Sequence, residues 1–404
     1  MTRHRFGPAL ARTAALVALA IVAGECPAPA QSPPIKIGLL MPGTGPFTVN
    51  AQRITTGVRL YFQSKDWQVA GRKIELVTED DQGDPQTSLT KTQKLVERDR
   101  IQALIGYLTT PSTYAARDYV TRQKLPTLAV SASNGLVHPG SPQRSPYMFR
   151  SYISYYGIGK SLAEWMYRHG HHRKVVLVAS NFGGALEPAF AYRTTFEKLG
   201  GQIVSEIKPP VATVDWAPWV AQIARAMGDA DAVVTIAYGA DAIRMVQTWT
   251  ESGLRGKVPL YGGEAFASEM LLPAMGAAAE GVRQLDSYCP AVETPENQAF
   301  VRLVRGAGQY PAENNFYGWT AAQTLWEAMN GLAGKVEDPE ALVQALRRVR
   351  YVGPMGPFHY DENHNPVLDA YVQEVRKIGG ELHNACADKV AQLGHPGDIP
   401  FPPR

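Results

Sequence analysis

The chain has 404 residues, of which 45% are hydrophobic and 19% are charged, and its formal net charge is +3. Length and composition of this kind predict about two to three folded units and exclude a largely disordered chain. The small net charge argues against a surface that binds nucleic acid.

Residues 1–30 have the pattern of a secretory signal peptide. An arginine-containing start is followed by the apolar run Ala14–Ala23 and by Ala28-Pro-Ala30. We expect cleavage near Ala30 rather than a lipoprotein site at Cys26, because Glu25 stands where such a site needs a small residue. Cleavage would leave a net charge of +1. No later stretch approaches the roughly 20 apolar residues of a membrane-spanning helix, so the mature chain is predicted to be a secreted, soluble protein.

From residue 35 onward, short runs rich in β-branched residues alternate with amphipathic segments of helical length. The clearest predicted strands are Ile35–Met41, Lys73–Thr78 and Lys174–Ser180. The clearest predicted helices are Pro85–Asp99, Leu186–Leu199 and Asp241–Ser252. This alternation predicts an α/β fold with mostly parallel sheets.

The series of strands restarts at Lys174, after the irregular stretch Ser131–Tyr156. With about ten strand candidates in all, a restart predicts two similar lobes with a cleft between them. Residues 388–404 are rich in proline and are predicted to form an extended tail.

The residues that follow the predicted strands indicate a binding site, because ligands of open parallel sheets lie beyond the carboxyl ends of the strands. These positions carry hydroxyl groups, glycines, aromatic rings and one carboxylate, Glu264, which follows Gly262-Gly263. Hydroxyl groups and free N–H groups suit a carboxylate, rings suit an apolar body, and Glu264 suits a cation. The set predicts a receptor for a small carboxylic acid such as an α-amino acid.

Catalytic and metal-binding motifs are missing from the sequence. It contains no nucleophile elbow, phosphate loop, zinc-protease motif or complete dinucleotide fingerprint. His169–His172 lies between a predicted helix and strand and is interpreted as a solvated turn, and Asp80, Asp81 and Asp84 are interpreted as turn and helix-start residues. We therefore expect no enzyme activity, metal or cofactor. Cys289 and Cys386 could form a disulfide, but the sequence does not show that they meet.

Several short motifs resemble, in their order and spacing, those of the periplasmic leucine/isoleucine/valine-binding protein family, the type I substrate-binding proteins of ABC importers. The resemblance runs from Ile35 to about Lys377. The motifs are Gly45-Pro46, Asp80–Pro85, Ile105–Thr110, Ser131–Ser133, Tyr238, Gly262–Glu264 and Met355–Asp361.

The resemblance implies two Rossmann-like lobes joined by a hinge of three crossings, near residues 152–156, 285–288 and 358–361. It divides the chain into an N-terminal lobe of residues 35–154 and 286–357 and a C-terminal lobe of residues 155–285 and 358–380. It also implies a monomeric binding protein that closes around a branched-chain or similar amino acid and delivers it to an ABC permease in the membrane.

The family's ligand contacts can be carried over to positions of this chain. The resemblance places the ligand carboxylate on Thr110 and the ammonium group on Ser131, Ser133 and Glu264. It implies that Tyr238 and Phe182 pack over the ligand. Leu108 and Asn50 complete the expected site.

Two positions depart from the family pattern. Asn50 stands where the family has a tyrosine, and Asn314 falls near the position of an apolar wall residue. These polar groups keep a second ligand class open, namely an aromatic carboxylate, an amide or a urea-like molecule. A secreted α/β hydrolase or a sensor protein is a remote alternative.

Overall fold

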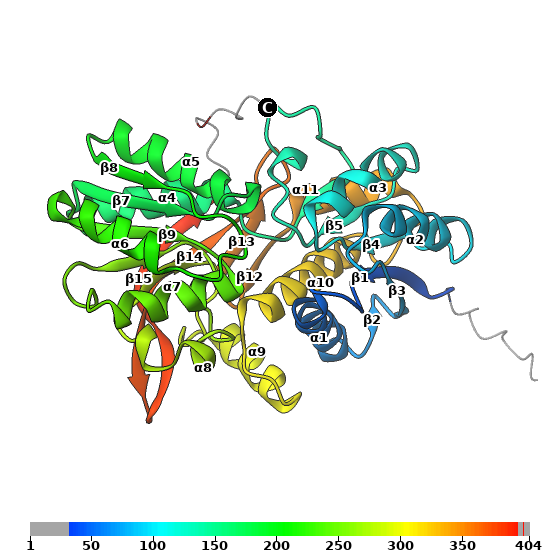
Figure 1. The fold of residues 1–404 in the computed structure, drawn as a ribbon. Helices are drawn as coiled ribbons and strands as arrows, with labels where there is room; N and C mark the ends of the chain where they lie inside the picture. The colour runs from blue at the N-terminus through cyan, green and yellow to red at the C-terminus, as the bar shows by residue number, and fades with distance from the viewer. Residues whose placement is uncertain (1–31, 395–398, 400–404) are drawn as a thin grey trace, which may run out of the picture. The chain divides into compact units, whose positions relative to one another are not determined.

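The computed structural model describes residues 32–394 and 399, and the predicted signal peptide lies outside this part. The strands of the first sheet come from the first part of the chain (Figure 1). They are β1 (Ile35–Met41), β2 (Gln68–Val69), β3 (Arg72–Asp80), β4 (Ala103–Ile105), β5 (Thr127–Ala129) and β6 (Met148–Arg150). Their order is β2-β3-β1-β4-β5-β6, and all pairs are parallel except β2 with β3.

The second sheet is built from later strands in the order β12-β13-β14-β11-β10-β9-β7-β8, with β15 paired to β14. Strands β8, β7, β9, β10 and β11 are parallel, whereas β12 to β15 pair in antiparallel fashion. The parallel strands are β7 (Lys174–Ala179), β8 (Gln202–Ile207), β9 (Ala232–Ile236), β10 (Leu260–Gly262) and β11 (Arg283–Asp286). The others are β12 (Arg350–Gly353), β13 (Gly356–Tyr360), β14 (Pro366–Ile378) and β15 (Glu381–Leu393).

Helices connect most of the parallel strands. Those of the first half are α1 (Thr48–Ser64), α2 (Pro85–Glu97), α3 (Thr110–Arg122), the 3₁₀ turn η1 (Asn134–Leu136), α4 (Tyr155–Arg168) and α5 (Gly183–Lys198). Those of the second half are α6 (Ala217–Ala226), η2 (Met227–Asp229), α7 (Gly239–Glu251), α8 (Leu272–Met275), η3 (Gly276–Ala279), α9 (Pro295–Gly306), α10 (Glu313–Gly331) and α11 (Pro339–Arg348). The predicted α/β fold with two mostly parallel sheets is confirmed. The lobe boundaries stay a prediction.

Both sheets have a point at which the strand order reverses. In the first sheet the neighbours β1 and β4 are followed by helices that lead to opposite edges, and in the second sheet β7 and β9 have this position. At such a point the loops beyond the carboxyl ends separate and leave room for a ligand. The topology therefore predicts a site bordered by the loops after β1, β4, β7 and β9.

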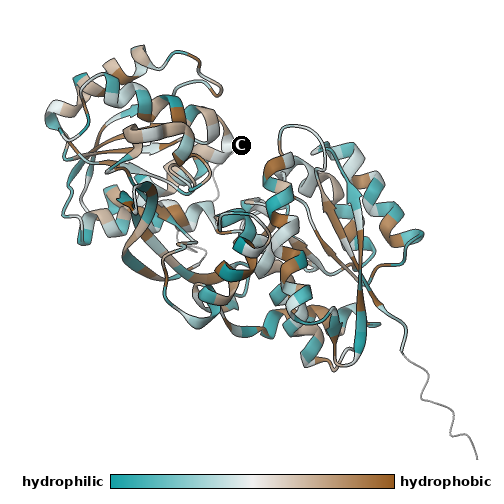
Figure 2. Cartoon of the chain, turned by 90° about the horizontal axis from the view of Figure 1, so that it is seen from below, coloured by the Kyte–Doolittle hydropathy of each residue, from teal (hydrophilic) through white to brown (hydrophobic). Residues whose placement is uncertain are grey.

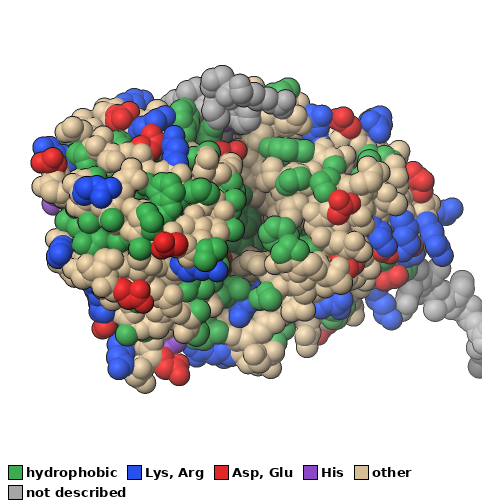
Figure 3. All heavy atoms as spheres, viewed as in Figure 1, with side chains coloured by type: hydrophobic (Ala, Val, Ile, Leu, Met, Phe, Trp, Pro, Cys, Tyr) green, Lys and Arg blue, Asp and Glu red, His purple; other side chains and the backbone are tan. Residues whose placement is uncertain are grey.

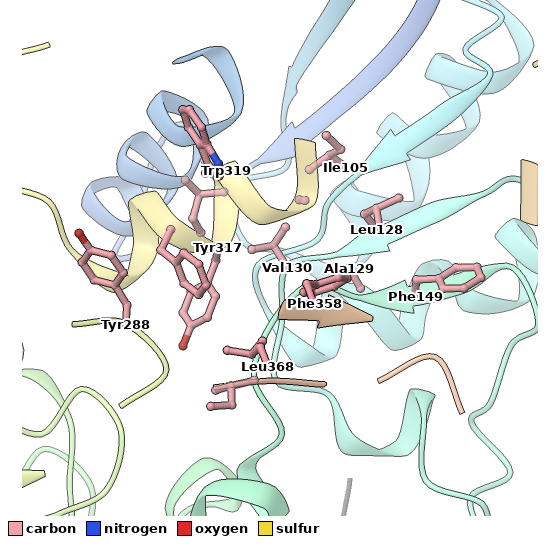
Figure 4. Close-up of a cluster of buried hydrophobic side chains, with 14 of the residues drawn as sticks. Ile105, Leu128, Ala129, Val130, Phe149, Tyr288, Tyr317, Trp319, Phe358 and Leu368 are labelled. Atoms are coloured by element: carbon pink, nitrogen blue, oxygen red, sulfur yellow. The ribbon is translucent and has the colours of Figure 1, made fainter. Parts of the chain in front are cut away.

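The core is formed by strand residues and by the inner faces of the helices, as the hydropathy colours of Figure 2 show along the strands. Ile105 and Leu128 are fully buried, and Trp319 of α10 lies beside α1 (Figure 4). There the ring of Trp319 meets Tyr61 edge-on, with 5.0 Å between centroids. Within the described residues, no helix has both the length and the apolar character that crossing a membrane requires.

Glycines allow two helix pairs to approach closely. A Cβ atom on Gly318 of α10 would lie 2.0 Å from the carbonyl oxygen of Ile54 in α1. A Cβ atom on Gly159 of α4 would lie 2.1 Å from the carbonyl oxygen of Pro188 in α5. Only glycine fits such backbone contacts. The second contact fixes the position of α5, which contributes to the site described below.

Several local predictions can be compared with the structure. Asp84 caps α2 by accepting a hydrogen bond from the Thr87 N–H at 2.7 Å, which confirms its interpretation as a helix-start residue. The histidine cluster lies between α4 and β7, where His172 Nε2 is 3.2 Å from the Tyr261 hydroxyl. The segment after β10 forms a short helix, α8, of four residues.

The last part of the chain differs from the prediction. Residues 388–393 belong to β15 and pair with β14, so the predicted tail is wrong for this stretch. The segment has few β-branched residues, and its strand conformation results from pairing with β14 rather than from local preference. Cys289 and Cys386 form a disulfide that links β15 to the loop after β11, with 6.1 Å between the Cα atoms.

Candidate functional site

A cavity of about 620 Å³ lies at the carboxyl ends of strands from both sheets. It is lined by Phe47, Asn50, Leu108, Thr109, Thr110, Pro111, Ala132, Ser133, Tyr152, Tyr155, Phe182, Gly183, Gly184, Glu187, Tyr238 and Asn314. These residues follow β1, β4, β5, β6, β7 and β9 or begin α10, as the strand topology predicts. On the face shown in Figure 3 the surface is hollowed, and hydrophobic side chains border the hollow.

Six of the eight residues predicted for the site line this cavity. Five of them follow strands, and Asn50 lies in the first turn of α1. The six are Asn50, Leu108, Thr110, Ser133, Phe182 and Tyr238. Asn314, at the second position that departs from the family pattern, lines it as well.

Ser131 lies behind the cavity wall. It is buried, and its hydroxyl is 2.5 Å from the Ser133 hydroxyl and 3.0 Å from that of Thr113. Ser131 thus orients Ser133, which faces the cavity.

Glu264 is also absent from the cavity lining. It is 1% exposed and accepts a hydrogen bond from the hydroxyl of Tyr317, whose ring stacks on that of Tyr152 with 4.1 Å between centroids. Burial, and then the charge of Asp286, raise the pKa of Glu264 well above its ordinary value. Glu264 is therefore one layer behind Tyr152, and it favours its neutral form.

The glycines before Glu264 have a packing role. A Cβ atom on Gly262 would lie 2.3 Å from the side chain of Phe266, so this glycine makes room for a buried ring rather than for a ligand. At Gly263 an added Cβ atom would have only ordinary contacts with Ile236.

Glu187 of α5 is a second carboxylate, and it lines the cavity although it is not among the residues that directly follow the predicted strands. The expectation of a single carboxylate, Glu264, at the pocket is therefore wrong. Glu187 lies in the second turn of α5, several residues after β7, and so does not stand at a strand end. The helical period offered a signal, because Gly183, Gly184 and Glu187 share one face of the helix.

Aromatic rings form much of the cavity wall. Tyr155 stacks near Tyr238 with 6.2 Å between centroids, and Phe182 meets Tyr238 edge-on at 6.0 Å. The Tyr238 hydroxyl donates to the carbonyl oxygen of Gly184 at 3.1 Å. Burial raises the pKa of both tyrosines, so their hydroxyl groups remain protonated. The wall offers flat apolar surface with few polar atoms.

The N-terminal ends of three helices reach the cavity. Thr109 caps α3, Phe182 stands before α5 and Tyr238 stands before α7, and all three residues line the cavity. The first N–H groups of a helix lack partners within the helix, and the helix dipole places partial positive charge there. No lysine or arginine belongs to the lining in the part of the chain that the structure describes. The cavity is suited to a small anion with an apolar body.

The two sheets enclose a ligand-sized cavity at the points where their strand orders reverse. This arrangement is typical of binding proteins of the α/β class. The sequence matches the family model "Periplasmic binding protein" over residues 34–380. The chain belongs to this periplasmic binding protein family.

Relatives resemble the chain over nearly its whole length. "Leu/Ile/Val-binding protein homolog 6" of Brucella melitensis is 26% identical over 390 residues, which are 95% of this chain and 98% of the relative. An ABC transporter substrate-binding protein from Sphaerobacter thermophilus is 32% identical, with a TM-score of 0.85 over 89% of this chain and 98% of that structure.

A further solved structure contains a bound molecule. The solute-binding protein of an ABC transporter from Rhodopseudomonas palustris BisB5, in complex with 3,4-dihydroxybenzoic acid, is 27% identical to this chain. Its TM-score is 0.80 over 90% of this chain and 99% of that structure.

Proposed function

We propose that this chain is the extracytoplasmic solute-binding component of an ABC importer and that it captures a small carboxylic acid. The observation that carries the proposal is the cavity itself, where the N-terminal ends of α3, α5 and α7 meet a wall of aromatic rings. Partial positive charge and free N–H groups suit the carboxylate, and the rings suit the remainder of the ligand. Membership of the periplasmic binding protein family supports the transport role.

The ring-lined wall favours an aromatic acid as the ligand. Phe47, Tyr152, Tyr155, Phe182 and Tyr238 all line the cavity, and a flat ring can stack on such surfaces or meet them edge-on. The relative from Rhodopseudomonas palustris, which holds 3,4-dihydroxybenzoic acid, supports this choice.

A branched-chain or similar amino acid, the first expectation from the sequence, is the second candidate. Glu187 supports it, because a carboxylate at the cavity could hold an ammonium group. The similarity to Leu/Ile/Val-binding protein homologs supports this candidate as well.

A ligand screen on the leader-free protein tests the proposal. Benzoate and hydroxybenzoates, and separately leucine, isoleucine and valine, would be added while the melting temperature is measured. A true ligand at 100 times its Kd stabilises the folded state by about 2.7 kcal/mol, which shifts the melting temperature by several degrees.

Phenol and isobutylamine, which lack the carboxyl group, serve as matched controls and should have no effect. If no acid of either class stabilises the protein, or if phenol is as effective as benzoate, the proposal of a carboxylic acid ligand is wrong. A periplasmic location, transfer to a membrane permease and a monomeric state complete the proposed role.

A further inference from the structure

Glu187 reaches the cavity from a fixed position. It lies on α5, whose neighbour α4 approaches as closely as the glycine at Gly159 permits. Its Oε2 atom accepts a hydrogen bond from Asn134 Nδ2 at 2.7 Å. Within the described residues Oε1 accepts no further hydrogen bond, and the side chain lines the cavity. One carboxylate oxygen is thus anchored and the other is available to a ligand.

The anchor itself is held by a buried arginine. Arg150 of β6 is fully buried and donates from Nη1 to Asn134 Oδ1 at 3.0 Å and to the carbonyl oxygen of Ala132 at 2.9 Å. Its Nη2 atom donates to Asn365 Oδ1 at 2.5 Å. Since the Asn134 oxygen accepts from Arg150, the amide nitrogen must face Glu187. This orientation fixes Oε2 on Asn134, and the other oxygen of the ionised carboxylate is a hydrogen-bond acceptor at the cavity.

The groups that face Glu187 come from several elements. They are Asn134 of η1, Arg150 of β6, Tyr155 and Tyr156 of α4, and Tyr238 after β9. Burial raises the pKa of Glu187 to about 7, although the Arg150 charge and the Asn134 hydrogen bond oppose the shift. The carboxyl group therefore changes its charge close to neutral pH.

We propose that Glu187 is a specificity residue that accepts a hydrogen bond from a hydroxyl group on the ring of a hydroxylated aromatic acid. The inference rests on the proposed function and deepens it by naming the ligand class. A ring without a donor would displace water from the ionised carboxylate and leave its free oxygen without a hydrogen bond. A ring hydroxyl group would replace the hydrogen bond that the displaced water had donated. The aromatic wall favours a ligand whose body is a flat ring, because Tyr155, Phe182 and Tyr238 line the cavity and offer ring contacts, and a hydroxyl group is the donor that such a ring acid carries.

The pH dependence has a defined sign. As the pH rises through neutrality the ionised fraction of Glu187 increases, so the hydrogen bond from a ring hydroxyl becomes charge-assisted and the hydroxylated acid is preferred. As the pH falls the protonated fraction increases, the desolvation penalty for benzoate becomes smaller, and the preference for the hydroxylated acid shrinks. The ratio of the two affinities should thus rise as the pH is raised from 6 to 8.

Calorimetric titration of the leader-free protein with benzoate and with 4-hydroxybenzoate at pH 6 and pH 8 tests the proposal. We expect wild type to prefer 4-hydroxybenzoate by about tenfold at pH 8 and by less at pH 6. In Glu187→Gln the ratio should fall to about twofold and lose its pH dependence, because an amide that keeps the Asn134 contact turns its NH₂ toward the ligand. Glu197→Gln, on an exposed position of the same helix, should behave as wild type.

Glu187→Leu provides a second variant in which neither charge nor hydrogen bonding remains, and circular dichroism confirms that each variant is folded. An unchanged ratio in folded Glu187→Gln, or no preference in wild type, would overturn the proposal. So would a loss of leucine binding with hydroxybenzoate binding intact, since Glu187 would then hold an ammonium group. If no carboxylic acid binds the wild-type protein, the proposed function itself is wrong, whereas the other contradicting results concern only the role of Glu187.

Discussion

Thr109 and Thr110 are neighbours at the start of α3, but their hydroxyl groups have different surroundings. The Thr109 hydroxyl accepts from the Ser112 N–H at 3.3 Å and donates to the Ser112 hydroxyl at 2.8 Å. The Thr110 hydroxyl has no hydrogen-bond partner among the described residues, and its side chain lines the cavity. The Thr109 hydroxyl therefore caps the helix, and the Thr110 hydroxyl is available to bind a ligand.

Substitution by valine should separate the two roles, because valine has nearly the same shape as threonine. Thr110→Val should weaken binding of the carboxylic acid by about 1.5 kcal/mol, or roughly tenfold, and leave the stability of the free protein unchanged. Thr109→Val should lower the free energy of unfolding by about 1 kcal/mol through loss of the helix cap. Calorimetry and urea denaturation measure the two quantities. Equal affinities for wild type and Thr110→Val would remove Thr110 from the site.

Glu264 makes a prediction about pH and stability. Because its pKa is raised in the folded state, the folded chain keeps a proton that the unfolded chain releases, so the free energy of unfolding falls as the pH rises above the ordinary carboxyl value. Glu264→Gln removes the titrating carboxyl group. The free energy of unfolding of this variant should therefore fall less between pH 5.5 and 8.5 than that of wild type.

Urea denaturation across this pH range provides the measurement. Residual dependence should remain in Glu264→Gln, because burial also raises the pKa of Asp286 and Glu313. Glu75→Gln, at an exposed position of β3, is the control and should follow wild type. Identical profiles for wild type and Glu264→Gln would contradict the predicted protonation state.

At the scale of elements, the contact between α1 and α10 depends on glycine. The added Cβ atom of Gly318→Ala would lie 2.0 Å from a backbone oxygen, which a flexible side chain cannot relieve. We expect a loss of about 1 to 3 kcal/mol in the free energy of unfolding. Gly331→Ala, at the end of the same helix, meets no atom within 4 Å and should instead stabilise by up to about 1 kcal/mol.

Thermal and urea denaturation of the two variants check this prediction. The matched pair separates the effect of helix propensity, which both changes share, from the effect of the helix contact, which only Gly318 makes. Stabilisation by Gly318→Ala would show that α1 and α10 are farther apart than described.

Helices and strands can be predicted from the sequence where the local residue pattern favours the same conformation as the tertiary contacts. The run of β-branched residues in Lys174–Ser180 predicts a strand, and β7 occupies Lys174–Ala179. Residues 388–393 were missed, because only pairing with β14 makes them a strand. The rule that ligands lie beyond strand ends predicts the positions of Phe182 and Tyr238 at the cavity. It does not predict Glu187, which lies one turn into a helix. It also does not predict the rings of Tyr152 and Tyr317 around Glu264, because these residues meet only in the folded chain.

For the whole molecule, the disulfide is the feature with the largest predicted effect on stability. Cys289 and Cys386 are 97 residues apart in sequence, and a loop of this size restricts the unfolded chain strongly. The chain-entropy account gives about 4.7 kcal/mol for such a bond. The double variant Cys289→Ser, Cys386→Ser should therefore unfold at markedly lower urea concentration than oxidised wild type.

Reduction provides the matched comparison. Wild type treated with dithiothreitol should unfold near the midpoint of the double variant, and the reductant should not affect the double variant. If oxidised and reduced wild type have the same midpoint, the bond either does not form or does not restrict the unfolded state.

The position of β14 has a consequence for how the protein matures. This strand, Pro366–Ile378, pairs with its sequence neighbours β13 and β15 and also with β11, which is synthesised about eighty residues earlier. A chain that is made from its N-terminus has all strands of the first sheet by residue 150, but the second sheet stays incomplete until nearly all residues have been made. Until β14 is made, the edge of β11 that pairs with it stays open, so the second sheet is the part of the molecule that completes last.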